Sequence, residues 1–257
     1  QVMRDQWRLP PEIDGLARLL RLETPVDGQT LGNPKHVDAV IEYLQSNKTL
    51  ISWVNPDTDK DALIDVRKKV VDHARQLHAA ATSSDPQAAL NKRQELQLLC
   101  AHREGKNGVS YWNGYVEHEL GAYTELRWYF GRPVMVTRND YALELMNGDV
   151  GICLPGPNGI LRVAFPSLGG SVRWIVPSRL DSVETVFAMT VHKSQGSEFK
   201  HVLLVVPAHD SPVLTRELVY TGLTRAREDL TIWAPRKEVL LQACSRRVLR
   251  SGGLGAG

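Results

Sequence analysis

The sequence predicts an α/β fold in which a largely parallel sheet is covered on both faces and a small all-β unit is inserted. Apolar runs at 96–101, 201–206 and 230–234 are typical of strands buried on both faces, as they are in parallel sheets. Segments with helical spacing separate these runs, and alternation of strands and helices indicates an α/β layer. Between residues 131 and 180 the pattern changes to short β-type runs, which indicates the insertion.

The composition excludes several classes of protein. The 257 residues carry 31 Lys and Arg against 29 Asp and Glu, with 42% hydrophobic and 23% charged residues. This balance is ordinary for a soluble globular protein and excludes a disordered chain, a collagen-like rod and a disulfide scaffold. No run of 18 apolar residues exists, so no membrane-spanning helix is expected. The net charge of +2 argues against a purely electrostatic nucleic-acid binder but permits a local basic site.

The cysteines suggest a reducing compartment. Cys100, Cys153 and Cys244 are odd in number and far apart, without the spacing of zinc ligands. The cytosol is therefore the expected location. The chain begins with Gln1 rather than Met, which suggests a piece of a longer protein.

The first 130 residues are predicted to be mostly helical. Helices are expected over 10–22, 34–44, 63–77, 86–94 and 110–129, and strands over 49–54 and 96–101. In these helices the apolar residues recur three or four positions apart and so share one face. Asn33 before Pro34 and Asp85 before Pro86 each supply an N-cap followed by a first-turn proline.

Strands dominate from residue 131 onward. Short β-type runs are predicted at 133–137, 151–154, 160–165 and 172–176, with tight turns between them. Such a series over about 50 residues predicts a small β-barrel, SH3-like in size. Later strands are expected at 186–191, 201–206 and 230–234, with helices at 215–227 and 235–243. The expected domains are one α/β unit formed by 1–130 and 181–257, and the inserted barrel 131–180.

The decapeptide T-V-H-K-S-Q-G-S-E-F at 190–199 follows a predicted strand and concentrates polar side chains. Its glycine, Gly196, permits a positive φ or a close approach of the backbone to a ligand. The Ser and Lys side chains can bind phosphate oxygens, and the carboxylate can accept a hydrogen bond from a ribose hydroxyl. For this loop alone, a polar surface turn is an equally acceptable interpretation.

The segment T-R-E-L-V-Y-T-G-L-T-R-A-R at 215–227 places two arginines two positions apart. Arg225 and Arg227 therefore do not share a helical face, and one can turn inward while the other meets solvent. An inward arginine suits a γ-phosphate, because the guanidinium is planar, always charged and bidentate. The alternative is a salt bridge with Glu217, Glu228 or Asp229, which is favoured for this segment alone.

Together the two segments resemble motifs V and VI of superfamily 1 DNA helicases. The wording is most similar to the RecD family, the alpha subunits of exodeoxyribonuclease V, the RecBCD complex. L-L-C-A-H-R-E-G-K-N-G-V at 98–109 and G-R-P-V-M-V-T-R-N-D at 131–140 also match. The resemblance runs from about residue 94 to 254. It implies the second, RecA-like (P-loop NTPase-type) motor domain of such a helicase, carrying an inserted SH3-like β-barrel.

The resemblance implies a set of nucleotide-binding residues. Arg225 would be the arginine finger that stabilises charge on the γ-phosphate across a cleft between two RecA-like domains. Arg8, in a weaker match to the family's motif IV, would be a second γ-phosphate arginine. Glu198 would lie at the nucleotide ribose, and Gln195 and Gly196 would couple the nucleotide state to the grip on DNA.

The resemblance also implies a path for single-stranded DNA. Thr190, His192 and Lys193 would lie toward the phosphates of the strand, and the barrel would help to hold it. Asn139 and Asn147 fall in matched segments of the barrel and are candidate DNA-binding residues. No metal-binding residues are expected in this chain.

One departure from the family decides what the chain can do. A helicase needs the phosphate loop G-x-x-x-x-G-K-[ST] and an acidic pair for Mg²⁺. Here the only Gly-Lys pair is Gly105-Lys106, with Cys100 at the first glycine position and Asn107 at the Ser/Thr position. ATP and Mg²⁺ would be held mainly by a first motor domain that this sequence lacks. The chain alone is expected neither to bind ATP tightly nor to hydrolyse it.

The leading hypothesis is the C-terminal motor half of an ATP-dependent 5′→3′ DNA helicase subunit in a bacterial RecBCD-like complex. The resemblance implies a role in double-strand-break repair and recombination, duplex DNA ends and single strands as partners, RecB- and RecC-like subunits, and a cytoplasmic location. One alternative is a non-catalytic module that binds DNA or docks subunits. Another is a stand-alone RecD-like helicase. No membrane partner is expected.

Two further patterns have ordinary explanations. His73 and His78 are five residues apart and lack an H-E-x-x-H motif, so they are interpreted as surface histidines rather than zinc ligands. Trp112, Tyr115 and Trp128 could stack on bases. Since they stand at helical spacing, packing in the core is the favoured interpretation.

Overall fold

The predicted α/β class with a parallel sheet is confirmed. A computed structural model describes residues 9–21, 34–46, 49–83, 85–121 and 126–246. The helices are α1 (Pro11–Arg21), α2 (Pro34–Gln45), α3 (Lys60–Thr82), α4 (Pro86–Arg93), α5 (Val109–Leu120), α6 (Arg216–Leu223) and α7 (Lys237–Ser245). A parallel sheet in the order β1-β10-β9-β2-β8 forms the centre of the molecule. Its strands are β1 (Ile51–Val54), β2 (Leu96–Cys100), β8 (Ala188–Thr190), β9 (Phe199–Val205) and β10 (Ala226–Trp233).

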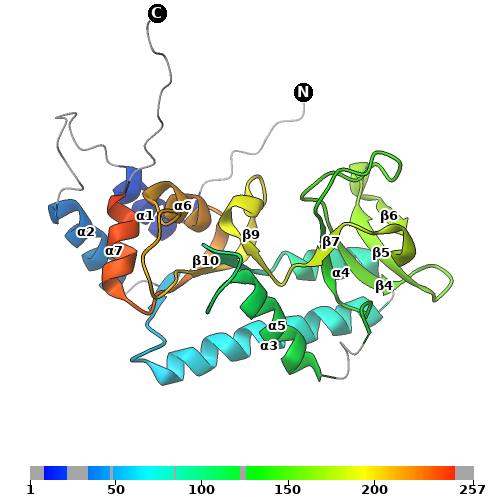
Figure 1. Cartoon of the computed structure of the whole chain (residues 1–257), viewed down its shortest axis with the longest axis horizontal. Coiled ribbons are helices and arrows are strands. Elements are labelled where there is room, and N and C mark those ends of the chain that lie inside the picture. Colours follow the sequence, from blue (N-terminus) through cyan, green and yellow to red (C-terminus); the bar gives the residue numbers. More distant parts are fainter. Residues whose placement is uncertain (1–8, 22–33, 47–48, 84, 122–125, 247–257) are drawn as a thin grey trace, which may run out of the picture.

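Helices cover both faces of this sheet (Figure 1). Successive residues of a strand point to opposite faces, and β9 shows this directly. Leu204 belongs to the hydrophobic cluster to which α1, α2, α6 and α7 contribute, whereas Leu203 and Val205 belong to the cluster to which α3, α4 and α5 contribute. Because β9 is buried from Val202 to Val205, its run of apolar residues has no solvent side. The described helices before residue 94 therefore contribute their buried residues to the core of the α/β layer.

A second, antiparallel sheet stands beside the first (Figure 1). Its strands are β3 (Pro133–Val136), β4 (Val150–Pro155), β5 (Leu161–Pro166), β6 (Val172–Ile175) and β7 (Val183–Thr185). They pair in the order β6-β5-β4-β3-β7 around a separate core that includes Val134, Cys153 and Phe165. Along the chain this sheet lies between α5 and β8, so it is an insertion into the α/β unit.

Three predicted boundaries are wrong, each for a local reason. The helix expected over 110–129 ends at Leu120, because Gly121 follows with a φ of +57°. The strand expected over 186–191 is replaced by β7 in one sheet and β8 in the other, joined by Val186 and Phe187. The helix expected over 215–227 ends at Leu223, because β10 already begins at Ala226.

Within the described ranges, none of the helices combines the length and the low polarity that a membrane-spanning segment requires.

Candidate functional site

The two segments singled out in the sequence lie against each other. The loop 191–198 begins with a turn of 3₁₀-helix, η4 (Val191–Ser194), which packs against α6. The loop leaves the carboxyl end of β8 and enters the amino end of β9. The backbone N–H of Phe199 there donates to the carbonyl of Arg225 at 2.9 Å. The predicted residues therefore divide into a nucleotide group at the amino ends of β9 and β10 and a DNA group at the carboxyl ends of β2 and β8.

Hydrogen bonds to backbone carbonyl groups, and not an ion pair with a carboxylate, hold the side chain of Arg225. Its Nε donates to the carbonyl of Thr221 at 3.1 Å, its Nη1 to the carbonyl of Ser197 at 3.2 Å, and its Nη2 to Oγ1 of Thr224 at 3.3 Å. Among the described residues no carboxylate forms an ion pair with it, so the salt-bridge alternative is not what the fold adopts. The half-buried guanidinium is thus fixed in place while its charge stays unneutralised.

Arg227 takes the carboxylate instead. Its Nε donates to Oε2 of Glu198 at 2.7 Å, and its Nη2 lies 2.5 Å from the same oxygen. Both side chains are partly exposed, at 40% and 34%, so solvent screens the pair and its stabilisation is modest. Glu198, predicted at a ribose, therefore has an arginine partner in this structure.

The turn between the two groups depends on a glycine. Gly196 has a φ of +84°, and no atom within 4 Å would meet an added Cβ. The glycine is therefore required for its backbone conformation, which side chains with a Cβ adopt at a cost, and not for space. Gln195 beside it is exposed, while Ser194 is fully buried and donates to the carbonyl of Val191 at 2.7 Å.

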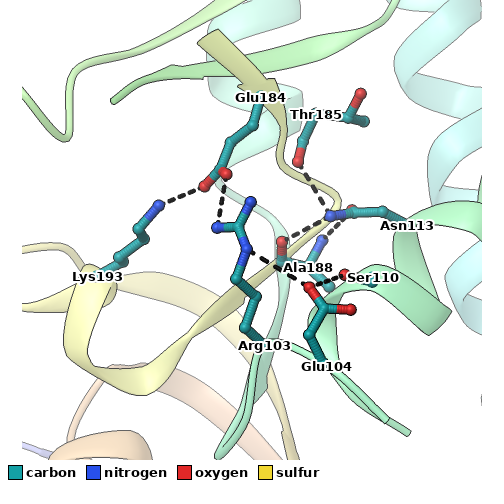
Figure 2. Close-up of polar contacts among 8 residues, drawn as sticks. All are labelled: Arg103, Glu104, Ser110, Asn113, Glu184, Thr185, Ala188 and Lys193. Atoms are coloured by element: carbon teal, nitrogen blue, oxygen red, sulfur yellow. Dashed lines mark hydrogen bonds and ion pairs between the residues drawn. The ribbon is translucent and has the colours of Figure 1, made fainter. Parts of the chain in front are cut away.

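The DNA group contains a charge cluster that sequence reasoning missed. Lys193 lies after β8 and pairs with Oε1 of Glu184 on β7, while Nη1 of Arg103, after β2, lies 2.8 Å from Oε2 of the same carboxylate (Figure 2). Arg103 also lies near Glu104, which accepts from the hydroxyl of Ser110 at 2.8 Å. Burial raises the pKa of the Glu184 carboxyl, but hydrogen bonds and charge from Lys193 and Arg103 outweigh it and hold the pKa below its usual value.

A sequence signal existed for Arg103. It follows a buried parallel strand, and polar residues just beyond the carboxyl ends of parallel strands gather at one edge of the sheet. His192 and Thr190 lie at the same edge, exposed and half-buried respectively. Thr190, His192 and Lys193 thus lie at the same edge of the sheet as Arg103.

Known proteins match the part of the chain that carries the two motif segments. A family model described as UvrD-like helicase C-terminal domain matches residues 185–233. The RecBCD enzyme subunit RecD of Mycolicibacterium smegmatis is 40% identical over 221 residues, which cover 84% of this chain and 38% of that protein. The chain is RecD-like. The resemblance stated from the motifs is confirmed, and the chain spans less than two fifths of the length of this curated relative.

Two more distant matches complete the comparison. The ATP-dependent RecD2 DNA helicase of Deinococcus radiodurans is 41% identical over 98 residues, 38% of this chain and 13% of that protein. A solved structure of two Pif1 helicases at forked double-stranded DNA covers 91% of this chain and 49% of its own, at 14% identity and a TM-score of 0.44.

In the RecD-like chain, the other predicted DNA residues lie in the inserted sheet. Asn139 and Asn147 are brought together, because Oδ1 of Asn139 accepts from the backbone N–H of Asn147 at 2.8 Å. Nδ2 of Asn139 donates to the hydroxyl of Tyr141 at 3.3 Å, and Tyr141 is 76% exposed. In this structure Asn139 therefore organises the loop between β3 and β4. Arg8, the second predicted γ-phosphate arginine, lies outside the described residues.

The inserted sheet is fixed to the parallel sheet by an amide of α5. Nδ2 of Asn113 donates to the carbonyls of Thr185 and Ala188 at 3.0 and 3.2 Å, and its Oδ1 accepts from the N–H of Ala188 at 2.8 Å (Figure 2). The buried amide of Gln97 on β2 donates to the carbonyl of Phe187 at 2.9 Å. These contacts hold the crossover from β7 to β8, and so set where Glu184 stands relative to Lys193.

His73 and His78, interpreted as surface residues, are both half-buried. His73 lines a cavity of about 10 Å³ together with Leu77 and Phe187. Burial lowers its pKa from 6.5 to about 4, the positive charges of Lys92, His201 and Arg93 add to this, and only Glu95 opposes it. His78 is half-buried, with Nδ1 2.7 Å from the carbonyl oxygen of Phe130.

The described part of the chain contains no group of three or more His, Cys, Asp or Glu side chains positioned to hold a metal ion.

The aromatic residues considered for base stacking pack within the protein. Trp112 is fully buried and packs edge-to-face on Trp233 with ring centroids 5.4 Å apart. Tyr115 and Trp128 are half-buried, and Tyr115 stacks on Tyr111.

Proposed function

We propose that the chain is the C-terminal motor part of an ATP-dependent 5′→3′ DNA helicase subunit of the exodeoxyribonuclease V type. It would form the second RecA-like domain from residues 1–130 and 181–257, with residues 131–180 as an inserted SH3-like barrel. The phosphate loop and the acidic pair that holds Mg²⁺ would belong to a first motor domain on the same polypeptide. The chain alone would then carry half of an ATP site and be inactive.

The observation that carries this proposal is the state of Arg225. An arginine that is half-buried, bonded to the carbonyls of Thr221 and Ser197, and without an acidic partner among the described residues is oriented but not neutralised. No carboxylate of the fold uses the positive charge of this arginine. The negative charge of a γ-phosphate at a domain interface would use it. A positioned arginine of this kind is worth several orders of magnitude in phosphoryl transfer.

A path for single-stranded DNA would run along the other end of the same loop. Thr190, His192 and Lys193 lie at the carboxyl ends of β2 and β8, beside the inserted sheet that carries Asn139 and Asn147. Gln195 and Gly196 stand between this group and Arg225, where they would couple nucleotide state to DNA grip, and Glu198 would exchange Arg227 for a ribose hydroxyl. Arg8 would supply the second γ-phosphate contact.

The relatives extend the proposal to a cellular setting. Since the M. smegmatis relative is a RecBCD enzyme subunit, RecB- and RecC-like proteins would be the partner subunits. The role would be double-strand-break repair and recombination in the bacterial cytoplasm. A stand-alone helicase is the second candidate, because an ATP-dependent RecD2 DNA helicase shares 41% identity over 98 residues with this chain.

The deciding experiment measures DNA-stimulated ATP hydrolysis by the full-length polypeptide that contains this chain. Arg225→Ala should lower kcat by about 10³-fold or more, while the affinity for single-stranded DNA changes little. Arg225→Lys should also be strongly impaired, because an ammonium cannot replace the planar fork of an arginine. Arg236→Ala is the matched control, since Arg236 is an exposed arginine at the start of α7.

Near-normal hydrolysis by Arg225→Ala would refute the arginine-finger assignment. Equal losses of ATPase activity and DNA affinity would instead indicate a structural role for Arg225. To separate the two candidate settings, purified RecB- and RecC-like proteins are mixed with the full-length polypeptide. Assembly of a stable complex supports the subunit, and vigorous unwinding without assembly supports the stand-alone helicase.

A further inference from the structure

Glu184 joins two cations that come from distant parts of the chain. It lies on β7, the last strand of the inserted sheet, whereas Lys193 follows β8 and Arg103 follows β2 of the parallel sheet. Each carboxylate oxygen has its own partner: Oε1 meets Lys193, and Oε2 lies 2.8 Å from Nη1 of Arg103 (Figure 2). One negative charge is therefore shared between two positive charges across the junction of the sheets.

The accessibility of the three side chains is uneven. Glu184 is 20% exposed, Lys193 33% and Arg103 57%. The two cations reach solvent more freely than the carboxylate between them. An anion approaching from solvent can therefore contact both cations, and in doing so it competes with the carboxylate for their donors.

An open groove of about 550 Å³ leads to this position. Besides the three charged residues it is lined by Thr137, Arg138, Asp181, Ser182 and Val183. Arg138 is exposed, and no ion pair to it is found among the described residues. The groove thus offers a third positive charge, from the inserted sheet, on the same side as Arg103 and Lys193.

We infer that Glu184 occupies the position of a nucleic-acid phosphate between Arg103 and Lys193 when no strand is bound, and that a single strand must take these two cations from it. The inference deepens the proposed function and rests on it, adding Arg103 and Arg138 as phosphate contacts and Glu184 as an internal competitor. A phosphodiester offers acceptor oxygens to both cations, as a carboxylate does, and an arginine can bind two of them at once.

Competition from Glu184 should lower the affinity for single-stranded DNA and also the dependence of that affinity on salt concentration. Binding of a single strand releases condensed counterions, and the logarithm of the affinity falls with the logarithm of the salt concentration by about 0.7 for each phosphate neutralised. In the wild type, Arg103 and Lys193 are already neutralised in part by Glu184. They therefore contribute less to affinity and to its salt dependence than two free cations would.

The test uses the full-length polypeptide that contains this chain, a fluorescein-labelled oligo-dT of roughly 20 nucleotides and fluorescence anisotropy over a series of salt concentrations. Glu184→Gln keeps an acceptor and removes the charge. It should raise the affinity at low salt several-fold and steepen the salt slope by up to about 1.4. That value is the upper limit for two freed cations, because Glu104 still lies 3.6 Å from Nε of Arg103. Glu184→Asp, with its carboxylate withdrawn by one methylene, should give a smaller gain of the same sign.

Two further variants make the result specific. Arg103→Ala combined with Glu184→Gln should lose about half of the added slope, because one of the two freed cations is gone. Asp14→Asn is the matched control: it removes the carboxylate of the 2.7 Å ion pair with Arg18 on α1, outside the residues that line the groove, and should leave affinity and slope unchanged.

A purely structural role for Glu184 would lower thermal stability in both Glu184 variants without steepening the salt slope. Wild-type binding with no gain in Glu184→Gln would overturn this inference and leave the proposed function standing. If neither protein retains the oligonucleotide at the lowest salt, both the inference and the proposed DNA path are overturned.

Discussion

Replacing His73 should remove a large part of the acid sensitivity of the fold. Burial against the cavity beside Leu77 and Phe187, reinforced by nearby cations, lowers the pKa of His73 from 6.5 to about 4. The unfolded chain binds a proton at His73 as the pH falls below about 6.5, whereas the folded chain does so only near 4. Stability is therefore complete above the unfolded value, falls between the two values, and loses nothing more from this residue below the folded value.

The size of the stability loss follows from the difference between the pKa of His73 in the unfolded and in the folded chain. At about 1.4 kcal/mol for each tenfold difference in proton affinity, the full penalty is about 3 kcal/mol, of which about 2 kcal/mol is lost between about pH 7.5 and about pH 5. That is a large share of a typical stability of about 5–15 kcal/mol. His73→Leu, which keeps a side chain of similar volume and cannot be protonated, should lose about 2 kcal/mol less than the wild type over this range.

The assay is equilibrium urea unfolding followed by tryptophan fluorescence at both pH values. His118→Leu is the matched control, because His118 is exposed on α5, and it should show the same pH loss as the wild type. The wild-type loss persisting in full in His73→Leu would refute the argument from burial. It would place the acid sensitivity on other groups.

Two other changes test how the site is held together. Asn113→Ala removes three hydrogen bonds to the crossover between β7 and β8 and should lower the free energy of unfolding by about 2–3 kcal/mol, measured by urea denaturation; an unchanged midpoint would contradict the assigned clamp. Gly196→Ala should cost about 1–2 kcal/mol because of its φ of +84°, whereas Gly114→Ala, in the interior of α5 with open space around it, should stabilise by up to about 1 kcal/mol.

The parallel sheet was predictable because its signal is local. A strand such as 201–206 is apolar at consecutive positions, and only burial on both faces explains that pattern. Leu203 and Leu204 confirm it by packing into different halves of the core. The cap at Asp85 is local in the same sense, since its side chain accepts from the N–H groups of Gln87 and Ala88.

The change of sheet at Val186 and Phe187 was not predictable, because nothing local marks it. Residues 186–191 are apolar except for Thr190, and this run predicts one strand. The break is imposed by Asn113 and Gln97, which lie about 70 and 90 residues away along the chain. A contact at that separation leaves no periodic trace in the sequence.

The candidate site shows the same difference between local signals, which the sequence carries, and long-range contacts, which it does not. The sequence alone singled out Lys193, Gln195 and Gly196 as candidates because their motif is contiguous, and the same is true of Arg225. Their partners were not found. The carboxylate that pairs with Lys193 belongs to another sheet, and Arg227 rather than Arg225 takes Glu198. A motif identifies the residue types that the chemistry needs, whereas their charge state at rest depends on neighbours that only the fold supplies.

The cations near the two ends of the loop 191–198 differ in whether a carboxylate pairs with them. At Arg225 a positive charge is fixed by carbonyl oxygens and left unpaired, while at Lys193 a positive charge is paired with Glu184. An unpaired cation suits a ligand that must be bound strongly in a transition state. A cation that must first give up a carboxylate suits a strand that has to be gripped and released repeatedly. Because η4 packs against α6, the helix that leads to Arg225, a change at either end of the loop would be felt at the other under the proposed function.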